Sequence, residues 1–190
     1  MKNRILSVIA ISILLTNIFS GCSKKCGDFN SDVINWLPYK KADLIILTYN
    51  TNKDTLTLKS HVINHTDKVR YNAKCECADS YSVVISSNSI HINVDFLNSK
   101  SIKDSFIKIN NDNLSFSEQL SFYYLNGKNY SNVLVYINKW QNQSTRFTKL
   151  YISKNIGIIE IVGQSEDWVI ENDTNKSIDV SEIDFNETNC

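Results

Sequence analysis

The sequence predicts a mainly β protein, in which an antiparallel sheet folds as a sandwich or a partly closed barrel with at most one or two short helices. Apolar and polar residues alternate with a period of two in a series of short segments, which is typical of half-buried strands. Asn-rich clusters that favour turns separate these segments, at 50–54, 110–113 and 126–129. Apolar residues make up 42% of the chain, which supports a core, and a domain of this length buries roughly 70% of its unfolded surface.

The first expected elements lie near the start of the domain. Residues 28–39 carry apolar side chains before Pro38, and we expect a helical turn or a docking segment that ends there. Residues 44–49 are apolar on both faces, as in a strand that is covered on both sides. Residues 55–63 alternate between two faces. The apolar face is expected to hold Leu56, Leu58 and Val62, and the polar face Thr57, Lys59 and His61.

The remaining strands follow at short spacing. The expected segments are 69–77, 81–87, 89–97, 106–109, 130–140, 147–153, 156–162 and 168–170. Residues 114–125 fit either a helix or a strand. Ser115 and Glu118 have the spacing of a capping box, which favours a helix, whereas the aromatic residues of the segment favour a strand. The sequence leaves this alternative open.

The first 21 residues are typical of a secretory signal. Lys2 and Arg4 give a positive start, and residues 5–19 are mostly apolar. This run is too short and too interrupted to span a bilayer comfortably, which takes about 20 predominantly apolar residues. The small residues Ser20 and Gly21 suit a signal peptidase. We therefore expect this stretch to be removed on export.

The residues Phe19-Ser20-Gly21-Cys22 resemble the lipobox of bacterial lipoproteins. The resemblance implies cleavage between Gly21 and Cys22, and a thioether-linked diacylglycerol on Cys22 with an N-acyl chain such as palmitate. Two or more acyl chains hold a protein firmly at a membrane. Phe19 departs from the family, which usually has Leu at that place. The alternative is an ordinary secretory signal cut nearby, with Cys22 as one half of a disulfide.

The residues that follow Cys22 bear on the location of the anchor. Residues 22–28 form a short polar tether. Ser23 is not the Asp that marks inner-membrane retention in familiar lipoproteins, so the resemblance implies the outer membrane. Lys24 and Lys25 replace the acidic run that follows the cysteine in many surface-exported lipoproteins. A domain that faces the periplasm is therefore expected rather than display on the cell surface.

A second resemblance is to small uncharacterised lipoproteins of the Bacteroidetes group. Residues 149–160 are similar to their late hairpin, with a Tyr-rich strand, a Lys-Asn turn and an apolar strand. Residues 36–39, with the strand after them and residues 54–56, are similar to the start of their mature domains. The resemblance implies a lipid-anchored β-rich domain and brings no reaction with it.

Charge and length limit the partners and the number of domains. The chain has 20 basic and 20 acidic residues, and removal of residues 1–21 takes away two basic and no acidic ones, which leaves a charge of −2. A nucleic-acid partner, which requires a strongly basic surface, is not expected. We expect a single β-rich domain at 29–171. Residues 172–190 form an acidic tail that is expected to be a frayed edge or disordered.

Four cysteines remain besides Cys22, namely Cys26, Cys75, Cys77 and Cys190. An exported compartment permits disulfides, and four cysteines allow three connectivities. Cys75 and Cys77 lie about 6.6 Å apart along one strand, near the far limit for a bridge between them. We expect each to pair with a separate partner, such as Cys26 or Cys190, or to be a buried thiol. No metal site or cofactor is expected, because no CxxC or further ligand cluster accompanies them.

No catalytic constellation is recognisable in the sequence. The chain has no Ser-His-Asp arrangement, Gly-rich phosphate loop or HExxH, and its carboxylates are dispersed. On one strand His61 and His65 would stand about 13 Å apart, too far to share a metal or a substrate atom. We interpret His61, His65 and His91 as polar residues that face solvent.

Two further features, the Asp54-Thr55-Leu56 motif and the Trp residues, have an ordinary structural interpretation and a functional alternative. Asp54-Thr55-Leu56 resembles the acceptor for O-glycosylation at Thr55 in Bacteroidetes exported proteins, although Thr55 is also an ordinary strand residue after a turn. Aromatic residues in β proteins are usually core residues or cross-strand pairs, and stacking on a sugar is the alternative. This applies to Trp36, Trp140 and Trp168.

The leading hypothesis is a lipid-anchored protein of the cell envelope whose β-domain is a non-enzymatic binding or chaperone-like module. Its expected partners are the membrane, through the covalent anchor, and an envelope protein, a lipid or a glycan as ligand. The alternative is a structural accessory subunit of an outer-membrane or surface complex. A hydrolase without a recognisable motif is the third hypothesis.

Overall fold

The computed structural model describes residues 23–70, 77–97, 102–140 and 144–189. Over these residues the chain is mainly β with two short 3-10 helices, which confirms the predicted fold class. The strands are β1 (Ser23–Lys25), β2 (Leu44–Tyr49), β3 (Asn52–Arg70), β4 (Ser80–Ser86), β5 (His91–Phe96), β6 (Ser105–Ile109), β7 (Asp112–Leu125), β8 (Lys128–Ile137), β9 (Phe147–Ser153), β10 (Gly157–Gly163), β11 (Asp167–Ile170) and β12 (Asp184–Asn189). The 3-10 helices are η1 (Ser31–Trp36) and η2 (Val180–Glu182). The predicted lipidation and cleavage residues Cys22 and Gly21 lie outside the described residues, as do Cys75 and Cys190.

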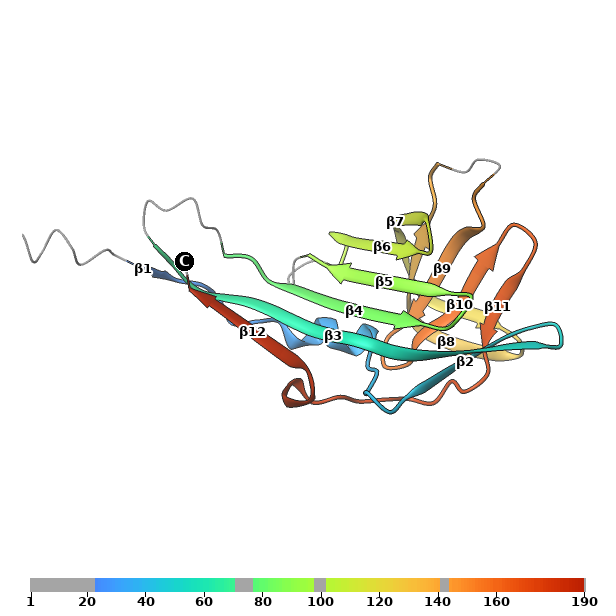
Figure 1. The fold of residues 1–190 in the computed structure, drawn as a ribbon, viewed down its shortest axis with the longest axis horizontal. Helices are drawn as coiled ribbons and strands as arrows, with labels where there is room; N and C mark the ends of the chain where they lie inside the picture. The colour runs from blue at the N-terminus through green and yellow to red at the C-terminus, as the bar shows by residue number, and fades with distance from the viewer. Residues whose placement is uncertain (1–22, 71–76, 98–101, 141–143, 190) are drawn as a thin grey trace, which may run out of the picture. The chain divides into compact units, whose positions relative to one another are not determined.

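The strands β2 to β11 form one sheet in the order β3-β2-β11-β10-β9-β8-β7-β6-β5-β4. The long strand β3 closes this order, because residues 52–57 pair with β2 and residues 57–61 pair with β4. Both of these pairings are antiparallel, as are those between the neighbouring strands from β4 to β11. The sheet therefore folds over itself as a partly closed barrel (Figure 1).

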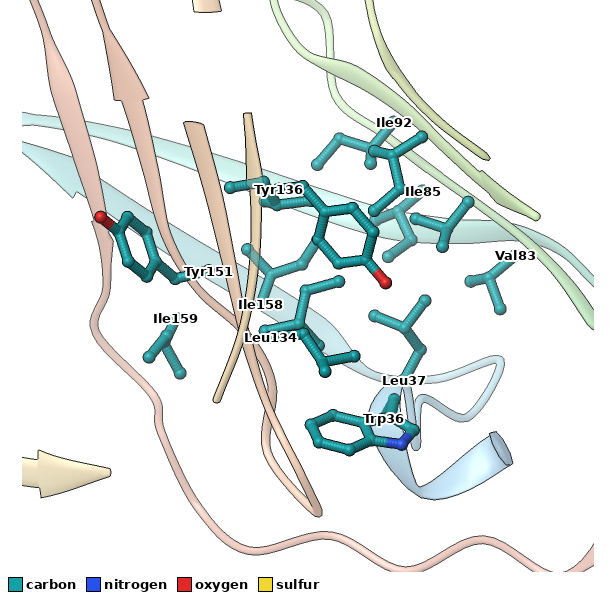
Figure 2. Close-up of a cluster of buried hydrophobic side chains, with 14 of the residues drawn as sticks. Trp36, Leu37, Val83, Ile85, Ile92, Leu134, Tyr136, Tyr151, Ile158 and Ile159 are labelled. Atoms are coloured by element: carbon teal, nitrogen blue, oxygen red, sulfur yellow. The ribbon is translucent and has the colours of Figure 1, made fainter. Parts of the chain in front are cut away.

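The inward face of the sheet carries the apolar residues that alternate in the sequence. In β4 and β5 the inward residues are Tyr81, Val83, Ile85, Ile92, Val94 and Phe96, all of them buried. Figure 2 shows Trp36 and Leu37, at the end of η1, in the same cluster as Leu134 of β8 and Ile158 of β10. Complete burial of one large apolar side chain contributes about 1.5–3 kcal/mol. Residues 28–39 thus form both the expected helical turn and a docking segment on the core.

The strand β3 differs from its prediction in one respect. The sequence predicts separate strands at 55–63 and 69–77, whereas β3 is one strand as far as it is described. Its pairing with β4 shifts register between Leu58 and Ser60. Such a bulge moves the side chains that follow it to the opposite face of the sheet. His61 is therefore turned inward and is 2% exposed, so the prediction that it faces solvent is wrong.

The turns follow the Asn clusters, as the sequence predicts. Asn50, Asn110 and Asn126 all adopt a positive φ of 49–52°. Asn126 and Gly127 are the two residues of the β7–β8 turn, and their positive φ angles match the type I′ turn that suits the twist of a hairpin. Residues 114–125 belong to β7, so the strand alternative for this segment is confirmed.

The chain divides into two compact units, and the single domain at 29–171 stays a prediction. The larger unit consists of Phe29–His65 and Ala78–Asn186. The described part of the smaller unit consists of residues 23–28, 66–70, 77 and 187–189. Within the smaller unit β1 pairs with β3, and Cys26 and Cys77 form a disulfide. The sequence had left this pairing open among several.

The acidic tail is ordered in the larger unit, which corrects the expectation of disorder for residues 172–186. Ile178 and Ile183 are buried in the core. The side chain of Asn172 accepts a hydrogen bond from the backbone N–H of Ile46 at 3.0 Å and donates one to the backbone oxygen of Leu44 at 2.6 Å. The tail then ends in η2 and in β12, which pairs with β3.

Candidate functional site

The structure places the three histidines in different environments. His61 Nε2 lies 2.6 Å from the hydroxyl of Tyr81, which donates its own proton to the backbone oxygen of Leu37 at 2.8 Å. His61 must therefore be the donor, with its proton on Nε2. Burial lowers the pKa of His61 to about 4, so its imidazole is neutral at pH 7. This arrangement is that of a hydrogen-bonded core residue.

The other predicted site residues do not gather at one place either. His65 contacts Asp79 at 2.7 Å and is buried, contrary to the prediction that it faces solvent, whereas His91 is exposed at the start of β5 as predicted. Thr55 is exposed on β3 and lines an open depression with Asp54. Its glycosylation stays a prediction. No group of three or more His, Cys, Asp or Glu suited to a metal ion occurs in the described part of the chain.

The far half of the β7–β8 hairpin has a geometry that the sequence did not predict. Asn132 in β8 has a φ of +52°, a conformation that breaks the alternation of a strand. Beyond this point Tyr123 of β7 stacks on Tyr151 of β9, with ring centroids 4.5 Å apart. Figure 2 shows Tyr151 and Ile159 on the other side of the strands from Leu134 and Tyr136. The far half of β7 therefore packs on the outer face of β9.

Hydrogen bonds to two acidic residues, Glu160 and Asp173, fix this hairpin in place. The Tyr123 hydroxyl donates a 2.6 Å hydrogen bond to Glu160 of β10, which is buried. Burial raises the pKa of Glu160, although the bond from Tyr123 acts in the opposite direction. The Tyr130 hydroxyl and the Lys128 ammonium group both donate to Asp173 at 2.6 Å. Burial acts to raise the pKa of Asp173, but the bonds from Lys128 and Tyr130 outweigh it and lower the pKa.

The same half of β7 leaves one of its edges without a partner strand. β6 pairs with β7 only as far as Ser115, whereas β8 continues to pair with β7 as far as Leu125. Within the described chain no other strand pairs with β7 beyond that point. We call the edge of residues 120–125 that faces away from β8 the open edge.

The turn determines which backbone groups face the open edge. Leu125 and Lys128 flank the two-residue turn and so form a hydrogen-bonded pair. Because hydrogen-bonded and non-hydrogen-bonded pairs alternate along an antiparallel ladder, the N–H and C=O groups of Tyr124 and Phe122 point away from β8. They point into the open edge, where a further strand would pair with them.

The side chains around the open edge are uncharged and largely aromatic. Residues 119–125 contain no charged residue, no Pro and no Gly. Phe122 and Tyr124 are 69% and 71% exposed. Natural proteins normally protect a strand edge with charges, Pro or a bulge, because an uncharged edge pairs readily with another chain. An edge left in this state is the strongest candidate for a functional surface on the larger unit.

Open depressions on the larger unit are polar. One of about 620 Å³ lies beside the turns at Asn50 and Asn126 and is lined mostly by Thr, Asn, Gln, Ser, Glu and Asp residues, together with Tyr49, Gly163 and two valines. Another of about 300 Å³ lies beside Trp140. Neither has the apolar lining expected of a lipid-binding pocket.

Comparison with known proteins adds no family to this description. No protein-family model matches the chain, and no curated protein or solved structure matches it. Among the described residues, no helix has both the length and the apolar character needed to cross a membrane.

Sequence reasoning did not identify Phe122 and Tyr124 as site residues. The aromatic content of residues 114–125 and the Asn-Gly turn were visible, and together they predict a hairpin. That one edge of this hairpin is open depends on the length of β6, which pairs with only the first residues of β7.

Proposed function

We propose that this chain is a lipid-anchored protein of the cell envelope whose β-domain is a non-enzymatic binding module. The open edge of β7 receives an extended segment of a protein partner, which adds to the sheet as a further strand. The observation that carries the proposal is the edge itself, where the N–H and C=O groups of Phe122 and Tyr124 point away from β8 and no strand of the described chain pairs with them.

The chemistry of the edge defines the partner. Strand addition obtains its affinity from main-chain hydrogen bonds and its specificity from alternate side chains. Leu120, Phe122 and Tyr124 lie on one face, so the partner strand needs apolar or aromatic residues at alternate positions on that face. Cross-strand aromatic pairs contribute roughly 0.2–1 kcal/mol each. Residues 119–125 carry no charge, so the partner segment needs no charged residues to match them.

An extended segment of another protein fits this edge better than a second copy of the chain. Six residues of strand span about 20 Å. A ladder of this length is sufficient for a bound peptide. It is short for a stable dimer, whose interface buries about 1,200–2,000 Å². Self-association is therefore an outcome that the experiment must distinguish.

Two variants at Tyr124 distinguish the contribution of the backbone N–H to binding from that of the aromatic side chain. Tyr124→Pro removes the N–H that faces the open edge without removing a hydrogen bond to β8, and Pro is tolerated on edge strands. Tyr124→Ala removes the same aromatic ring but keeps the N–H. Strand addition predicts that Tyr124→Pro abolishes binding and that Tyr124→Ala weakens it less.

The assay is photo-crosslinking of the full chain in cells, with p-benzoylphenylalanine at position 122. The expected result is at least one adduct whose partner peptide, identified by mass spectrometry, joins an extended segment to the hairpin. The adduct should disappear when Tyr124→Pro is added and persist with Tyr124→Ala. An adduct equally strong in both variants, or one formed only by a second copy of the chain, would contradict the proposal.

The lipid anchor rests on the lipobox resemblance at Cys22, which lies outside the described residues. Metabolic labelling with a fatty-acid analogue should mark the wild-type chain and leave Cys22→Ala unmarked. We place the anchor in the outer membrane with the domain facing the periplasm. Protease treatment of intact cells should then spare the domain, and digestion of the domain would assign it to the cell surface instead.

A structural accessory subunit is the second candidate, because the same open edge suits permanent assembly. The two functions differ in stoichiometry. A subunit gives one partner in constant ratio to the anchored chain after crosslinking, whereas a binding module gives several adducts or a ratio that changes with growth conditions.

A further inference from the structure

A second surface of the larger unit is a depression of about 300 Å³ beside Trp140, in the segment after β8. It is lined by Asn111, Asp112, Asn113, Asn138, Trp140, Ser144 and Thr145. Trp140 is 86% exposed, whereas Trp36 and Trp168 are 5% and 6% exposed. A Trp ring that lies open at the rim of a polar depression offers a flat apolar face beside hydrogen-bonding groups.

Three buried polar side chains line the depression, those of Asp112, Asn138 and Thr145. Asp112 and Asn138 are 8% and 7% exposed. One carboxylate oxygen of Asp112, Oδ2, accepts the backbone N–H groups of Arg146 and Phe147 at 2.9 and 2.8 Å. The other oxygen, Oδ1, has only a 3.5 Å contact from Asn138 Nδ2. Since a carboxylate oxygen can accept two good hydrogen bonds, Oδ1 retains acceptor capacity.

Asn138 is held in a fixed orientation and retains a donor. Its backbone N–H donates to Thr148, and its Oδ1 accepts the backbone N–H of Trp140 at 3.0 Å. Its Nδ2 group has two protons, of which one is used in the long contact to Asp112. The depression therefore combines an acceptor on Asp112 with a donor on Asn138.

We infer that this depression binds a saccharide, with one pyranose ring against the face of Trp140. A sugar hydroxyl is both a donor and an acceptor, so one hydroxyl can donate to Asp112 Oδ1 and accept from Asn138 Nδ2. The C–H face of the ring covers apolar surface of Trp140, whose indole is otherwise left in water. A volume of about 300 Å³ lies at the small end of ligand pockets and suits a single sugar unit. The site is separate from the open edge and does not depend on the proposed function.

The test uses the full chain in detergent micelles with free D-glucose, D-galactose, D-mannose, L-fucose and N-acetyl-D-glucosamine as probes. Saturation-transfer NMR should detect at least one of these sugars on the wild-type chain. Acrylamide quenching gives an independent measurement, because Trp140 is the exposed Trp and the other two are buried. The sugar that binds should reduce quenching several-fold.

Variants assign the signal to the site. Trp140→Ala should abolish saturation transfer, and Trp140→Phe should retain part of it because an aromatic face remains. Asp112→Asn replaces an acceptor with a donor and should also abolish the signal. Phe122→Ala is the control, since it removes an exposed aromatic residue at the open edge and should leave the signal unchanged.

Three results would overturn the inference. The first is the absence of saturation transfer to all five sugars, and the second is saturation transfer that survives Trp140→Ala. The third is saturation transfer that disappears when a calcium chelator is added, because this would indicate a bound cation rather than direct recognition of a hydroxyl. Should Asp112→Asn fail to fold, the Trp140 variants still decide, because the exposed indole contributes little to the core.

Discussion

Gly157 provides the sharpest test of how the η1 segment is held on the sheet. Tyr39 follows η1, is fully buried and accepts a 2.6 Å hydrogen bond from the backbone N–H of Ile158. Gly157 has a φ of +97°, and a Cβ placed there would meet the ring of Tyr39 at its Oη, Cζ and Cε1 atoms, the last at 2.9 Å. Substitution Gly157→Ala therefore forces a fully buried Tyr to move.

The expected cost has three parts. The positive φ costs an L-residue about 1–2 kcal/mol. Overpacking against a buried side chain costs about 1–3 kcal/mol. Displacement of the Tyr39 hydroxyl leaves the N–H of Ile158 buried and unpaired, at about 1–3 kcal/mol. We expect Gly157→Ala to lower the free energy of unfolding by about 4 kcal/mol or more.

Gly127→Ala is the matched control. Gly127 also has a positive φ, of +82°, but a Cβ there has no atom within 4 Å. Both substitutions share the backbone strain and the smaller entropy of the unfolded chain, so these effects largely cancel in the comparison. The difference between the two variants is the cost of disturbing Tyr39, about 3 kcal/mol. For a chain of this size it corresponds to roughly 6–12 °C in Tm.

The assay is thermal and urea unfolding of both variants followed by circular dichroism. Equal destabilisation by Gly157→Ala and Gly127→Ala would refute the reasoning, because it would show that Tyr39 is not held against β10. If Gly157→Ala does not yield folded protein, Tyr39→Phe tests the same contact. It should cost about 1–3 kcal/mol through the unpaired N–H of Ile158.

Three further predictions concern pH and redox state. Burial lowers the pKa of His61 from 6.5 to about 4, so the stability that depends on its neutral form is complete above pH 6.5 and is lost as pH falls toward 4. The free energy of unfolding should fall by about 3 kcal/mol over this range. Urea titrations of His61→Gln should lack this pH dependence. Burial raises the pKa of Glu160 above its ordinary 4.5, so the wild type loses stability as pH rises through the raised value. Glu160→Gln should therefore gain stability relative to the wild type toward pH 7. Parallel pH profiles of the free energy of unfolding in the two proteins would contradict this. The disulfide between Cys26 and Cys77, with a sequence separation of 51, should contribute roughly 4 kcal/mol, so a reductant should lower the Tm of the wild type and leave a Cys26→Ala/Cys77→Ala variant unchanged.

The local features of the fold were predictable from the sequence because their causes are local. Alternation of apolar and polar residues predicts strands, and β9 at Phe147–Ser153 matches its expected bounds. The left-handed turn at Asn126 and Gly127 follows from residue types that tolerate positive φ. The end of the helical turn before Pro38 follows from the restricted conformation of the residue that precedes a proline.

Features that depend on a distant strand could not be predicted in this way. The inward orientation of His61 depends on a register shift against β4, a strand about twenty residues away in the chain. Residues 114–125 fitted either a helix or a strand, because the spacing of Ser115 and Glu118 favours a helix and the aromatic residues favour a strand, and pairing with β8 decided between them. The disulfide partner of Cys77 was likewise one of several until β1 was paired with β3.

The saccharide site likewise depends on contacts between distant parts of the chain and could not be predicted from local sequence. Residue type alone does not distinguish Trp140 from Trp36 and Trp168, since exposure is decided by what packs around each ring. The Asp112 and Asn138 side chains lie 26 positions apart and meet only in the folded sheet.

The sequence by itself therefore determined the fold class, the positions of the turns and the expectation of an exported, anchored chain, since backbone preference, binary patterning and a signal sequence act over short stretches. The tertiary structure alone decided which edge of β7 lies open and which Trp lies beside a buried carboxylate. These depend on where neighbouring strands end and which faces they cover, and pairing between distant segments is a property of the whole chain.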